Sequence, residues 1–188
     1  ALPFLRDTGK VRPGHCVLIN GASGGIGTFA VQLAKHFGAV VTGVCSGANV
    51  ALVQQLGADH VVDYHTADFT ATHEAYDIIF DTVGKSSFTR CKPCLKPGGV
   101  FLQAAFSPAT FPRVLWTRAF GSKKLRIAAT GLRRPAERVK DLDFLRELAE
   151  AGKLLSVVGK TFAMDEIQSA HEYVETGHKR GNAVVQFV

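Results

Sequence analysis

The stretch NGASGGIG, Asn20–Gly27, follows the apolar run Cys16–Asn20 and precedes a segment with apolar residues at helical spacing. A glycine-rich turn between a buried strand and the N-terminus of a helix binds phosphate, because backbone N–H groups and the helix dipole both attract the anion. Gly24 lets the backbone approach a pyrophosphate closely, and Gly27 lets the helix pack tightly against the strand. The stretch therefore predicts a strand–loop–helix unit that holds the pyrophosphate of a dinucleotide.

The glycines of this stretch can be read in two registers. Ala22–Gly27 is a Rossmann fingerprint with Ala in the first Gly position, whereas Gly21, Gly25 and Gly27 give the GxxxGxG of short-chain dehydrogenases. That class carries a Tyr-x-x-x-Lys pair as its catalytic base, and none of the tyrosines in this chain has a Lys four residues later. The first register is therefore favoured, and the expected cofactor-binding residues of the loop are Ala22, Ser23, Gly24, Gly25, Ile26 and Gly27.

Short apolar, β-branched runs alternate with amphipathic segments along the chain. The runs predict strands at Cys16–Asn20, Val40–Cys45, His60–Val62, Asp77–Asp81, Val100–Ala104 and Leu125–Thr130. The segments between them predict a helix that ends near Gly38, a second at roughly Val50–Leu56, and a third at Ser86–Leu95 that ends in the turn Pro97–Gly99. Unbroken apolar strands are typical of sheets buried on both faces. The expected fold class is therefore α/β, a doubly wound parallel Rossmann sheet with helices on both faces.

The pattern changes after Pro135. It predicts a charged helix at Arg138–Glu150, a strand at Ser156–Phe162, a helix at Asp165–Glu175 and a last strand at Asn182–Val188. We expect residues 1–155 to form the dinucleotide-binding domain and residues 156–188 to form a C-terminal appendix.

The chain has 188 residues, of which 46% are hydrophobic, and a formal net charge of +6. No apolar run approaches the roughly 20 residues that a membrane-spanning helix needs. Lys and Arg cluster between Arg90 and Lys140 without a nucleic-acid motif, so we expect a solvated basic face or a surface complementary to another domain, and no nucleic-acid partner. The first residues include neither an initiator Met nor a signal-peptide layout. We expect a segment from within a longer chain and a cytoplasmic location, with an organelle left open.

Cys91 and Cys94 form the motif CKPC, a spacing shared by redox-active and zinc-binding sites. No second pair supplies the other ligands of a tetrahedral zinc site, and a helix that ends at Leu95–Gly99 also accounts for the spacing. None of the histidines lies with Asp, Glu or Cys at a spacing that suits a metal or catalytic site. We therefore expect no metal site in this chain, and the residues assign no catalytic acid or base.

Five segments carry a resemblance that spans almost the whole chain: Leu5–Ser46, Leu52–Tyr64, Tyr76–Gly84, Leu95–Gly99 and Gly177–Val188. They include LVQQLGADHVVDY, YDIIFDTVG, LKPGG and GHKRGNAVVQFV. Together they resemble the cofactor domain of the medium-chain dehydrogenase/reductases, in particular its quinone oxidoreductase-like branch, whereas the segment from Phe106 to Pro135 is the least specific. The resemblance implies a barrel-like substrate domain before this chain, an active cleft between the two domains, and an appendix (156–188) that packs on the substrate domain.

The resemblance also implies a nicotinamide cofactor. NAD enzymes usually place an acid after the second strand, but here that strand ends in Cys45 and Ser46, which permits NADP. Tyr64 matches a tyrosine that reaches the 2′-phosphate in related quinone reductases. Ser46 could instead cap the next helix, and the Arg that relatives often carry after the Ser is absent, which leaves Lys179 or Arg180 to supply the charge. We expect NADPH, with NADH as the alternative.

Ligands of doubly wound sheets bind beyond the carboxyl ends of the strands. The residues expected to face ribose and nicotinamide there are Thr82, Val83, Gly84, Ala104, Ala105 and Phe106. Ordinary strand-to-loop packing is the alternative for these residues. The resemblance implies hydride transfer to a quinone or another activated carbonyl or enone substrate. A module that senses NADPH without turnover and a zinc-dependent alcohol dehydrogenase-like enzyme are the alternatives.

Leu125–Thr130 would be the edge strand of the predicted sheet. Related reductases dimerise by pairing this strand with its copy, so the resemblance implies a homodimer. In the alternative, Lys123 and Lys124 are charges that protect the edge from pairing.

Overall fold

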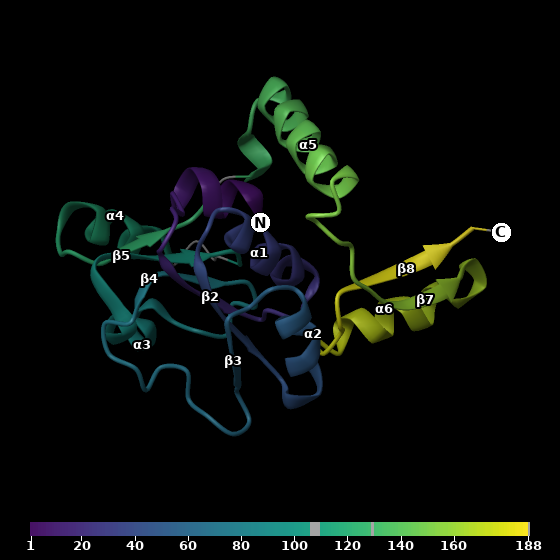
Figure 1. Cartoon of the computed structure of the whole chain (residues 1–188), viewed down its shortest axis with the longest axis horizontal. Coiled ribbons are helices and arrows are strands. Elements are labelled where there is room, and N and C mark those ends of the chain that lie inside the picture. Colours follow the sequence, from purple (N-terminus) through teal and green to yellow (C-terminus); the bar gives the residue numbers. More distant parts are fainter. Residues whose placement is uncertain (106–109, 129, 188) are drawn as a thin grey trace.

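The computed structural model describes residues 1–105, 110–128 and 130–187. Its centre is a six-stranded sheet in the order β3-β2-β1-β4-β5-β6, in which every pair of neighbours is parallel (Figure 1). The strands are β1 (Cys16–Asn20), β2 (Val40–Cys45), β3 (His60–Asp63), β4 (Tyr76–Asp81), β5 (Leu95–Gln103) and β6 (Lys124–Arg126). The chain winds outward from β1 in both directions, which is the doubly wound order. The predicted fold class is confirmed.

Two hydrophobic clusters lie on opposite faces of this sheet. Val17 and Ile19 of β1 belong to one cluster, and Leu18 between them belongs to the other, because successive strand residues point to opposite faces. The first face is covered by a π-helical turn (Pro3–Thr8), α1 (Gly25–His36) and α2 (Val50–Gln55). The second face is covered by α3 (Phe88–Cys91) and α4 (Phe111–Ala119).

The bounds predicted for β1 and β2 are confirmed, but the third predicted helix, Ser86–Leu95, is too long. Helix α3 ends at Cys91 and a 3₁₀ turn, Lys92–Cys94, follows it, since Pro93 offers no N–H to continue the helix. Strand β5 already begins at Leu95, which pairs with Tyr76. The turn at Pro97–Gly99 is therefore an irregularity within β5 rather than the end of a helix.

The last strand of the sheet is also shorter than predicted. β6 covers only Lys124–Arg126, and Thr130–Leu132 forms a 3₁₀ turn where the strand Leu125–Thr130 was expected. The sequence did not predict α4, which lies in the least specific segment. Its Thr117 hydroxyl accepts a hydrogen bond from the N–H of Leu125 at 3.1 Å, so α4 packs directly on β6.

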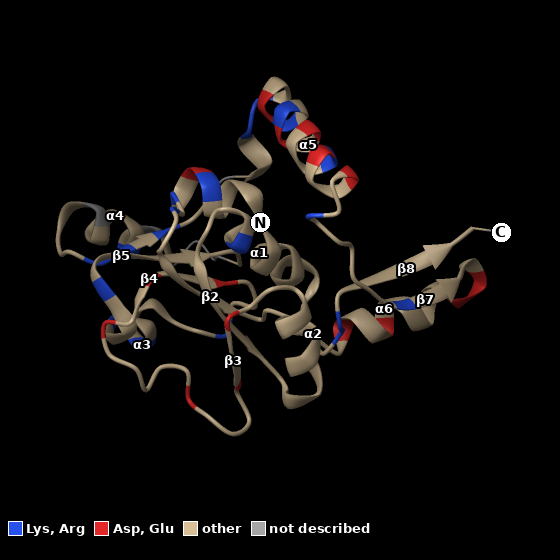
Figure 2. Ribbon diagram, viewed as in Figure 1, with Lys and Arg blue, Asp and Glu red and all other residues tan. Residues whose placement is uncertain are grey.

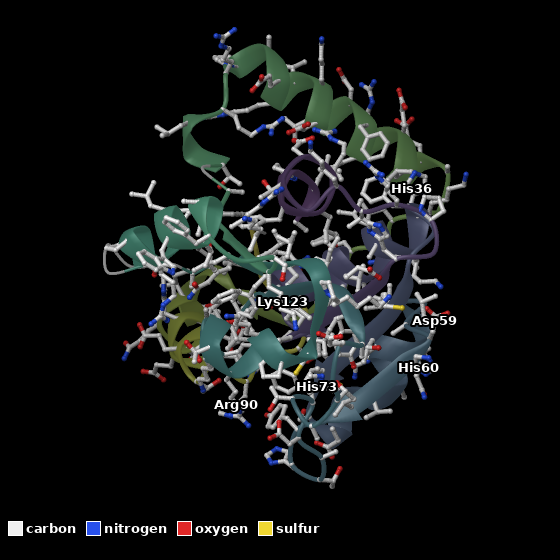
Figure 3. The ribbon with its side chains drawn as sticks, turned by 90° about the vertical axis from the view of Figure 1, so that its left-hand side faces the viewer. His36, Asp59, His60, His73, Arg90 and Lys123 are labelled. Atoms are coloured by element: carbon white, nitrogen blue, oxygen red, sulfur yellow. The ribbon has the colours of Figure 1, made fainter. Side chains whose placement is uncertain are left out.

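Helix α5 (Pro135–Glu150) projects from the sheet and begins earlier than predicted, with Pro135 in its first turn. Arg6 and Arg133 both pair with Asp141 of this helix, at 2.6 and 3.1 Å. Figure 3 shows His36 at the end of α1, where its ring lies edge-on to Phe144 of α5 at 5.8 Å. These contacts hold α5 against the start of the chain.

Positive and negative side chains are mixed along α5, as Figure 2 shows. Several cations of the basic segment are paired within the chain: Arg90 with Asp68, Lys96 with Asp77 and Lys123 with Glu74. Burial alone would raise the pKa of the Asp77 carboxyl, but Lys96 and the N–H of Cys16 hold it below its usual range. The predicted basic face is thus dispersed over several elements.

The C-terminal segment forms a separate unit beside α1 and α2. It consists of β7 (Val158–Ala163), a 3₁₀ turn (Met164–Glu166), α6 (Ile167–Glu175) and β8 (Asn182–Gln186). β7 and β8 pair in parallel as a two-stranded sheet of their own and add no strand to the main sheet.

Candidate functional site

A pocket of about 800 Å³ lies beyond the carboxyl ends of β1, β2 and β4. Nine of the residues expected to bind the cofactor line it: Ser23, Gly24, Gly25, Ile26, Cys45, Ser46, Tyr64, Thr82 and Val83. The lining residues that sequence reasoning did not propose include Asn20, Gly21, Asn49, His65, Phe69, Lys85, Ser86, Arg90, Val174, Gly177, His178 and Asn182. The predicted location, at the switch point of the sheet, therefore coincides with the pocket.

The glycine loop uses glycines from both registers. Gly21 turns the chain with φ +81°, and a Cβ there would collide with the side chain of Val83. A Cβ on Gly27 would collide with the carbonyl oxygen of Gly21, so this glycine lets α1 pack on the loop. Gly24 precedes α1 in extended conformation, and a Cβ there would contact the carbonyl oxygen of Gly21 at 3.4 Å. Ala22 is fully buried below the pocket and, like Gly27, does not line it.

The end of β2 presents two polar side chains to the pocket. Ser46 makes no capping hydrogen bond with its side chain; its Oγ accepts a bond from the Asn49 amide at 3.0 Å. The N–H of Tyr64 donates to the carbonyl oxygen of Cys45 at 3.1 Å, which brings the tyrosine beside Ser46. The Tyr64 side chain stays exposed.

Strand pairing also brings an acid to this end of the sheet, which the sequence did not suggest. Asp63 is opposite Cys45 in the β2–β3 ladder, and its Oδ2 would lie 2.6 Å from a Cβ on Gly47. Burial, together with the Asp63 charge, raises the pKa of Cys45 to about 11. The carboxylate lies behind the Ser46–Gly47 turn and is not part of the pocket lining.

A buried carboxylate organises the end of β4. Asp81 is fully buried, and its oxygens accept the backbone N–H groups of Val83, Gly84 and Ser86 at 3.1–3.2 Å. The Asn20 amide donates to the same carboxylate at 3.0 Å. Asp81 and Asn20 thus fix the segment that lines the pocket, and sequence reasoning missed both. The available signal was an acid directly after the apolar run of a strand.

The end of β5 lies next to this segment. The N–H of Ala104 donates to the carbonyl oxygen of Asp81 at 3.0 Å, and a Cβ on Gly84 would lie 3.0 Å from the Cβ of Ala105. Gly84, Ala104 and Ala105 therefore gather at the expected edge without lining the pocket. Their role in cofactor binding stays a prediction, and Phe106 lies outside the described residues.

The segment before β8 closes one side of the glycine loop. The N–H of Gly181 donates to the carbonyl oxygen of Ser23 at 2.8 Å. The Lys179 ammonium donates to the carbonyl oxygen of Gly181 at 3.0 Å and would lie 2.9 Å from a Cβ on Gly25. Lys179 thus places a positive charge at the N-terminus of α1, whereas the exposed Arg180 does not line the pocket.

Within the described ranges, no three His, Cys, Asp or Glu side chains lie close enough together to bind a metal ion. Cys91 and Cys94 are buried free thiols. This donor set does not fit a zinc site.

The family model for zinc-binding dehydrogenases matches residues 56–185. The chain belongs to the zinc-binding dehydrogenase family. It is a quinone oxidoreductase-like member of the medium-chain dehydrogenase/reductases, as the sequence motifs predicted. The chain is 35% identical to the mitochondrial NAD(P)H oxidoreductase RTN4IP1 of Bos taurus, over 93% of this chain and 48% of that protein. It is 32% identical to the trans-enoyl reductase pgmF of Aspergillus terreus, over 94% of this chain and 53% of that protein.

Among solved structures, the quinone oxidoreductase from Coxiella burnetii superposes with a TM-score of 0.84 at 28% identity, over 97% of this chain and 56% of that one. The chain therefore spans about half the length of the curated relatives it matches. No helix in the described part of the chain is long and apolar enough to cross a membrane. The cytoplasmic location stays a prediction.

Proposed function

We propose that this chain is the NADPH-binding domain of an oxidoreductase. The observation that carries the proposal is the pocket itself, in which the open Gly24 loop, the N-terminus of α1 and the Lys179 ammonium converge. A helix N-terminus with a nearby cation suits a pyrophosphate, because N–H groups, helix dipole and ammonium all favour negative charge. A volume of about 800 Å³ is in the range of cofactor sites.

Each end of the pocket would hold one half of the cofactor. Ser46 and Tyr64 would bind the adenosine ribose with its 2′-phosphate, since Ser46 is not used as a helix cap. Thr82 and Val83, with Gly84, Ala104 and Ala105 beside them, would hold the nicotinamide half. Phe106, which lies outside the described residues, is proposed for the same half from the sequence alone. The cofactor supplies a hydride when bound, and the protein orients the ring and excludes water. Asp81 supports this role by fixing the backbone of the segment after β4.

The proposed acceptor is a quinone or another activated carbonyl or enone, in keeping with the names of the relatives. The test is oxidation of NADPH by the whole protein, followed by absorbance with a benzoquinone and with an α,β-unsaturated ketone. Turnover with either supports the proposal. NADPH binding without turnover on any quinone or enone would favour a sensing module instead.

We also propose that residues 1–155 form the cofactor domain and that residues 156–188 pack on a substrate domain.

We further propose that the protein is a homodimer. β6 is an edge of the sheet. The neighbouring α4 exposes Leu115 and Trp116, and Phe120, the residue directly after α4, is exposed as well. Lys123 forms an ion pair with Glu74 at 3.1 Å. Its charge is therefore partly compensated and opposes the pairing of β6 with a second copy less than a free lysine would. Sedimentation equilibrium should give twice the chain mass, and Trp116→Ala should weaken the dimer; a monomer at every concentration would contradict this.

A further inference from the structure

A 2′-phosphate at the end of β2 needs a positive partner, because a dianion taken from water is stable only with charged or hydrogen-bonded neighbours. Ser46, Asn49 and Tyr64 supply neutral polar groups there. The Lys and Arg residues among the described lining are Lys85, Arg90 and Lys179. Their positions decide whether one of them can supply the charge.

Each of these three cations either forms an ion pair with an acid or lies away from the place proposed for the 2′-phosphate. Lys179 lies against Gly25 at the N-terminus of α1, where the pyrophosphate would bind. Lys85 follows Gly84 in the segment after β4, on the nicotinamide side. Arg90 donates to the Asp68 carboxylate at 3.0 Å. The pKa of Asp68 is lowered to about 2 by hydrogen bonds from the backbone N–H and the hydroxyl of Thr70 and by the bond from Arg90. Asp68 is therefore ionised at neutral pH, and Arg90 is paired with it in this structure.

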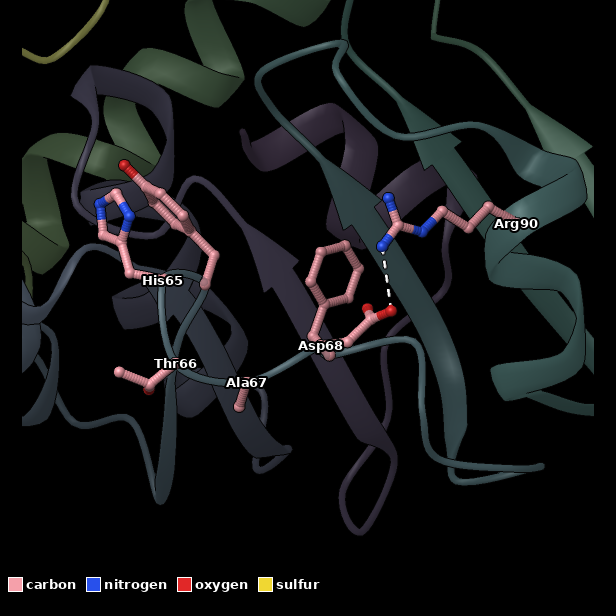
Figure 4. A pocket seen from close by; sticks show the side chains of 7 residues that line it. His65, Thr66, Ala67, Asp68 and Arg90 are labelled. Atoms are coloured by element: carbon pink, nitrogen blue, oxygen red, sulfur yellow. Dashed lines mark hydrogen bonds and ion pairs between the residues drawn. The ribbon is translucent and has the colours of Figure 1, made fainter.

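His65 is the ionisable side chain that follows Tyr64 directly. Its ring lies 4.4 Å from the ring of Tyr64, centroid to centroid, and the His65 side chain is exposed. His65 lines both the large pocket and a smaller one of about 360 Å³ that opens beside it (Figure 4). In the same view, the Arg90–Asp68 pair lies apart from the His65 ring. The His65 ring thus borders the place proposed for the 2′-phosphate, and it forms no ion pair with another residue of the described part of the chain.

We propose that His65 is the residue that discriminates NADPH from NADH, and that it does so only while its imidazole is protonated. The inference rests on the proposed function, because it concerns the same cofactor. Imidazoles in proteins change charge between about pH 5 and 8. An imidazolium would pair with the 2′-phosphate of NADPH, which NADH lacks, so preference for NADPH should decline as pH rises.

The other charged groups around His65 do not reproduce this behaviour. The Asp63 carboxylate accepts the backbone N–H of His65 at 3.0 Å and makes no hydrogen bond with the imidazole ring within the described residues. Asp68 is neutralised by Arg90, and the raised pKa of Cys45 keeps that thiol neutral. His178 reaches the pocket from the turn after α6, where its Nδ1 lies 2.7 Å from the carbonyl oxygen of Thr176. His178 is therefore the competitor that the test must separate from His65.

The test is calorimetric titration of the protein with NADPH and with NADH across about pH 6.5 to 8.5. The ratio of the two affinities should fall by about tenfold over this range, the size of one charge-assisted hydrogen bond. His65→Gln should give a low ratio and His65→Lys a high ratio, each nearly independent of pH. The 2′-phosphate itself gains a proton near pH ~6. This protonation belongs to the ligand, so it affects all variants equally. His60→Gln, in an exposed residue at the start of β3, is the control and should behave as wild type.

A second measurement separates charge from a structural role. In buffers of different ionisation enthalpy, NADPH binding near about pH 7.5 should take up protons in wild type but not in His65→Gln, and NADH binding should take up none. An unchanged pH dependence in His65→Gln, or its loss in His178→Gln alone, would overturn the inference. If NADPH binds but the ratio of the NADPH and NADH affinities does not change with pH, only this inference is overturned. If NADPH does not bind at any pH, the proposed function is overturned as well.

Discussion

Gly181 donates its backbone N–H to the carbonyl oxygen of Ser23 at 2.8 Å, and this bond ties the segment before β8 to the glycine loop. An isolated bridge between Gly24 and Gly181 runs beside it. Because of these contacts, Lys179 reaches the N-terminus of α1 from the opposite end of the chain. The proposed pyrophosphate site is therefore built from both ends of the sequence.

Replacing Lys179 by Gln should weaken NADPH and NADH binding alike, by about tenfold, because the pyrophosphate is common to both. Fluorescence titration of the reduced nicotinamide gives both dissociation constants. Arg180→Gln changes the exposed neighbouring cation and should leave both constants nearly unchanged. A loss confined to NADPH would instead place Lys179 at the 2′-phosphate.

Gly27→Ala should lower the free energy of unfolding by about 1–3 kcal/mol, since the added Cβ would meet the backbone of Gly21 and Ala22. Urea denaturation measures the change. Gly131→Ala is the matched control, because no described atom beyond its chain neighbours lies within 4 Å of its Cβ position; it should stay within about 0.5 kcal/mol of wild type. Equal stability of the two variants would show that α1 does not pack on the loop as described.

Asp81→Ala should destabilise the protein by about 3 kcal/mol, because three part-buried backbone N–H groups and the buried Asn20 amide lose their acceptor. Asp81→Asn keeps the Oδ1 acceptor and loses the partner of Ser86, so its cost should be nearer about 1 kcal/mol. Both values come from denaturation curves, with the exposed Glu147→Ala as control. If Asp81→Asn lowers the free energy of unfolding as much as Asp81→Ala does, the charge of the carboxylate stabilises the protein rather than its hydrogen bonds.

The CKPC thiols should be unreactive in the folded protein. Burial, with the charges of Cys94 and Asp81, raises the pKa of Cys91 to about 12, and burial also raises the pKa of Cys94. Only thiolates react with maleimide at an appreciable rate. At mildly alkaline pH, native Cys91 and Cys94 should label slowly and the urea-unfolded chain quickly, as mass spectrometry would show. Rapid labelling of either native thiol would point to a redox site.

Local features of the fold could be predicted from the sequence. The bounds of β1 and β2 follow from unbroken apolar runs, and Gly24 and Gly27 follow from the needs of a phosphate loop. The motif LKPGG was wrongly predicted to end a helix, because Pro and Gly both terminate helices and occur at irregular positions within strands. Only the pairing of Leu95 with Tyr76 shows that the strand has already begun.

Features that depend on distant contacts could not be predicted. Asp81 acts together with Asn20 on a neighbouring strand, and Asp63 reaches Gly47 only through the β2–β3 ladder. Lys179 and Arg180 were the two candidates for the charge at the 2′-phosphate, and the fold of the C-terminal unit places Lys179 at Gly25. Hydrophobic periodicity carries no information on such pairings.

The most direct test of cofactor binding is calorimetric titration of wild type and Gly24→Asp with NADPH and NADH. Wild type should bind NADPH more tightly than NADH, and the variant should bind neither, because a carboxylate would occupy the open side of the loop and repel the pyrophosphate. Gly131→Asp should bind like wild type, because Gly131 does not line the pocket. Absent binding, equal affinities at low pH, or undiminished binding by Gly24→Asp would contradict the account.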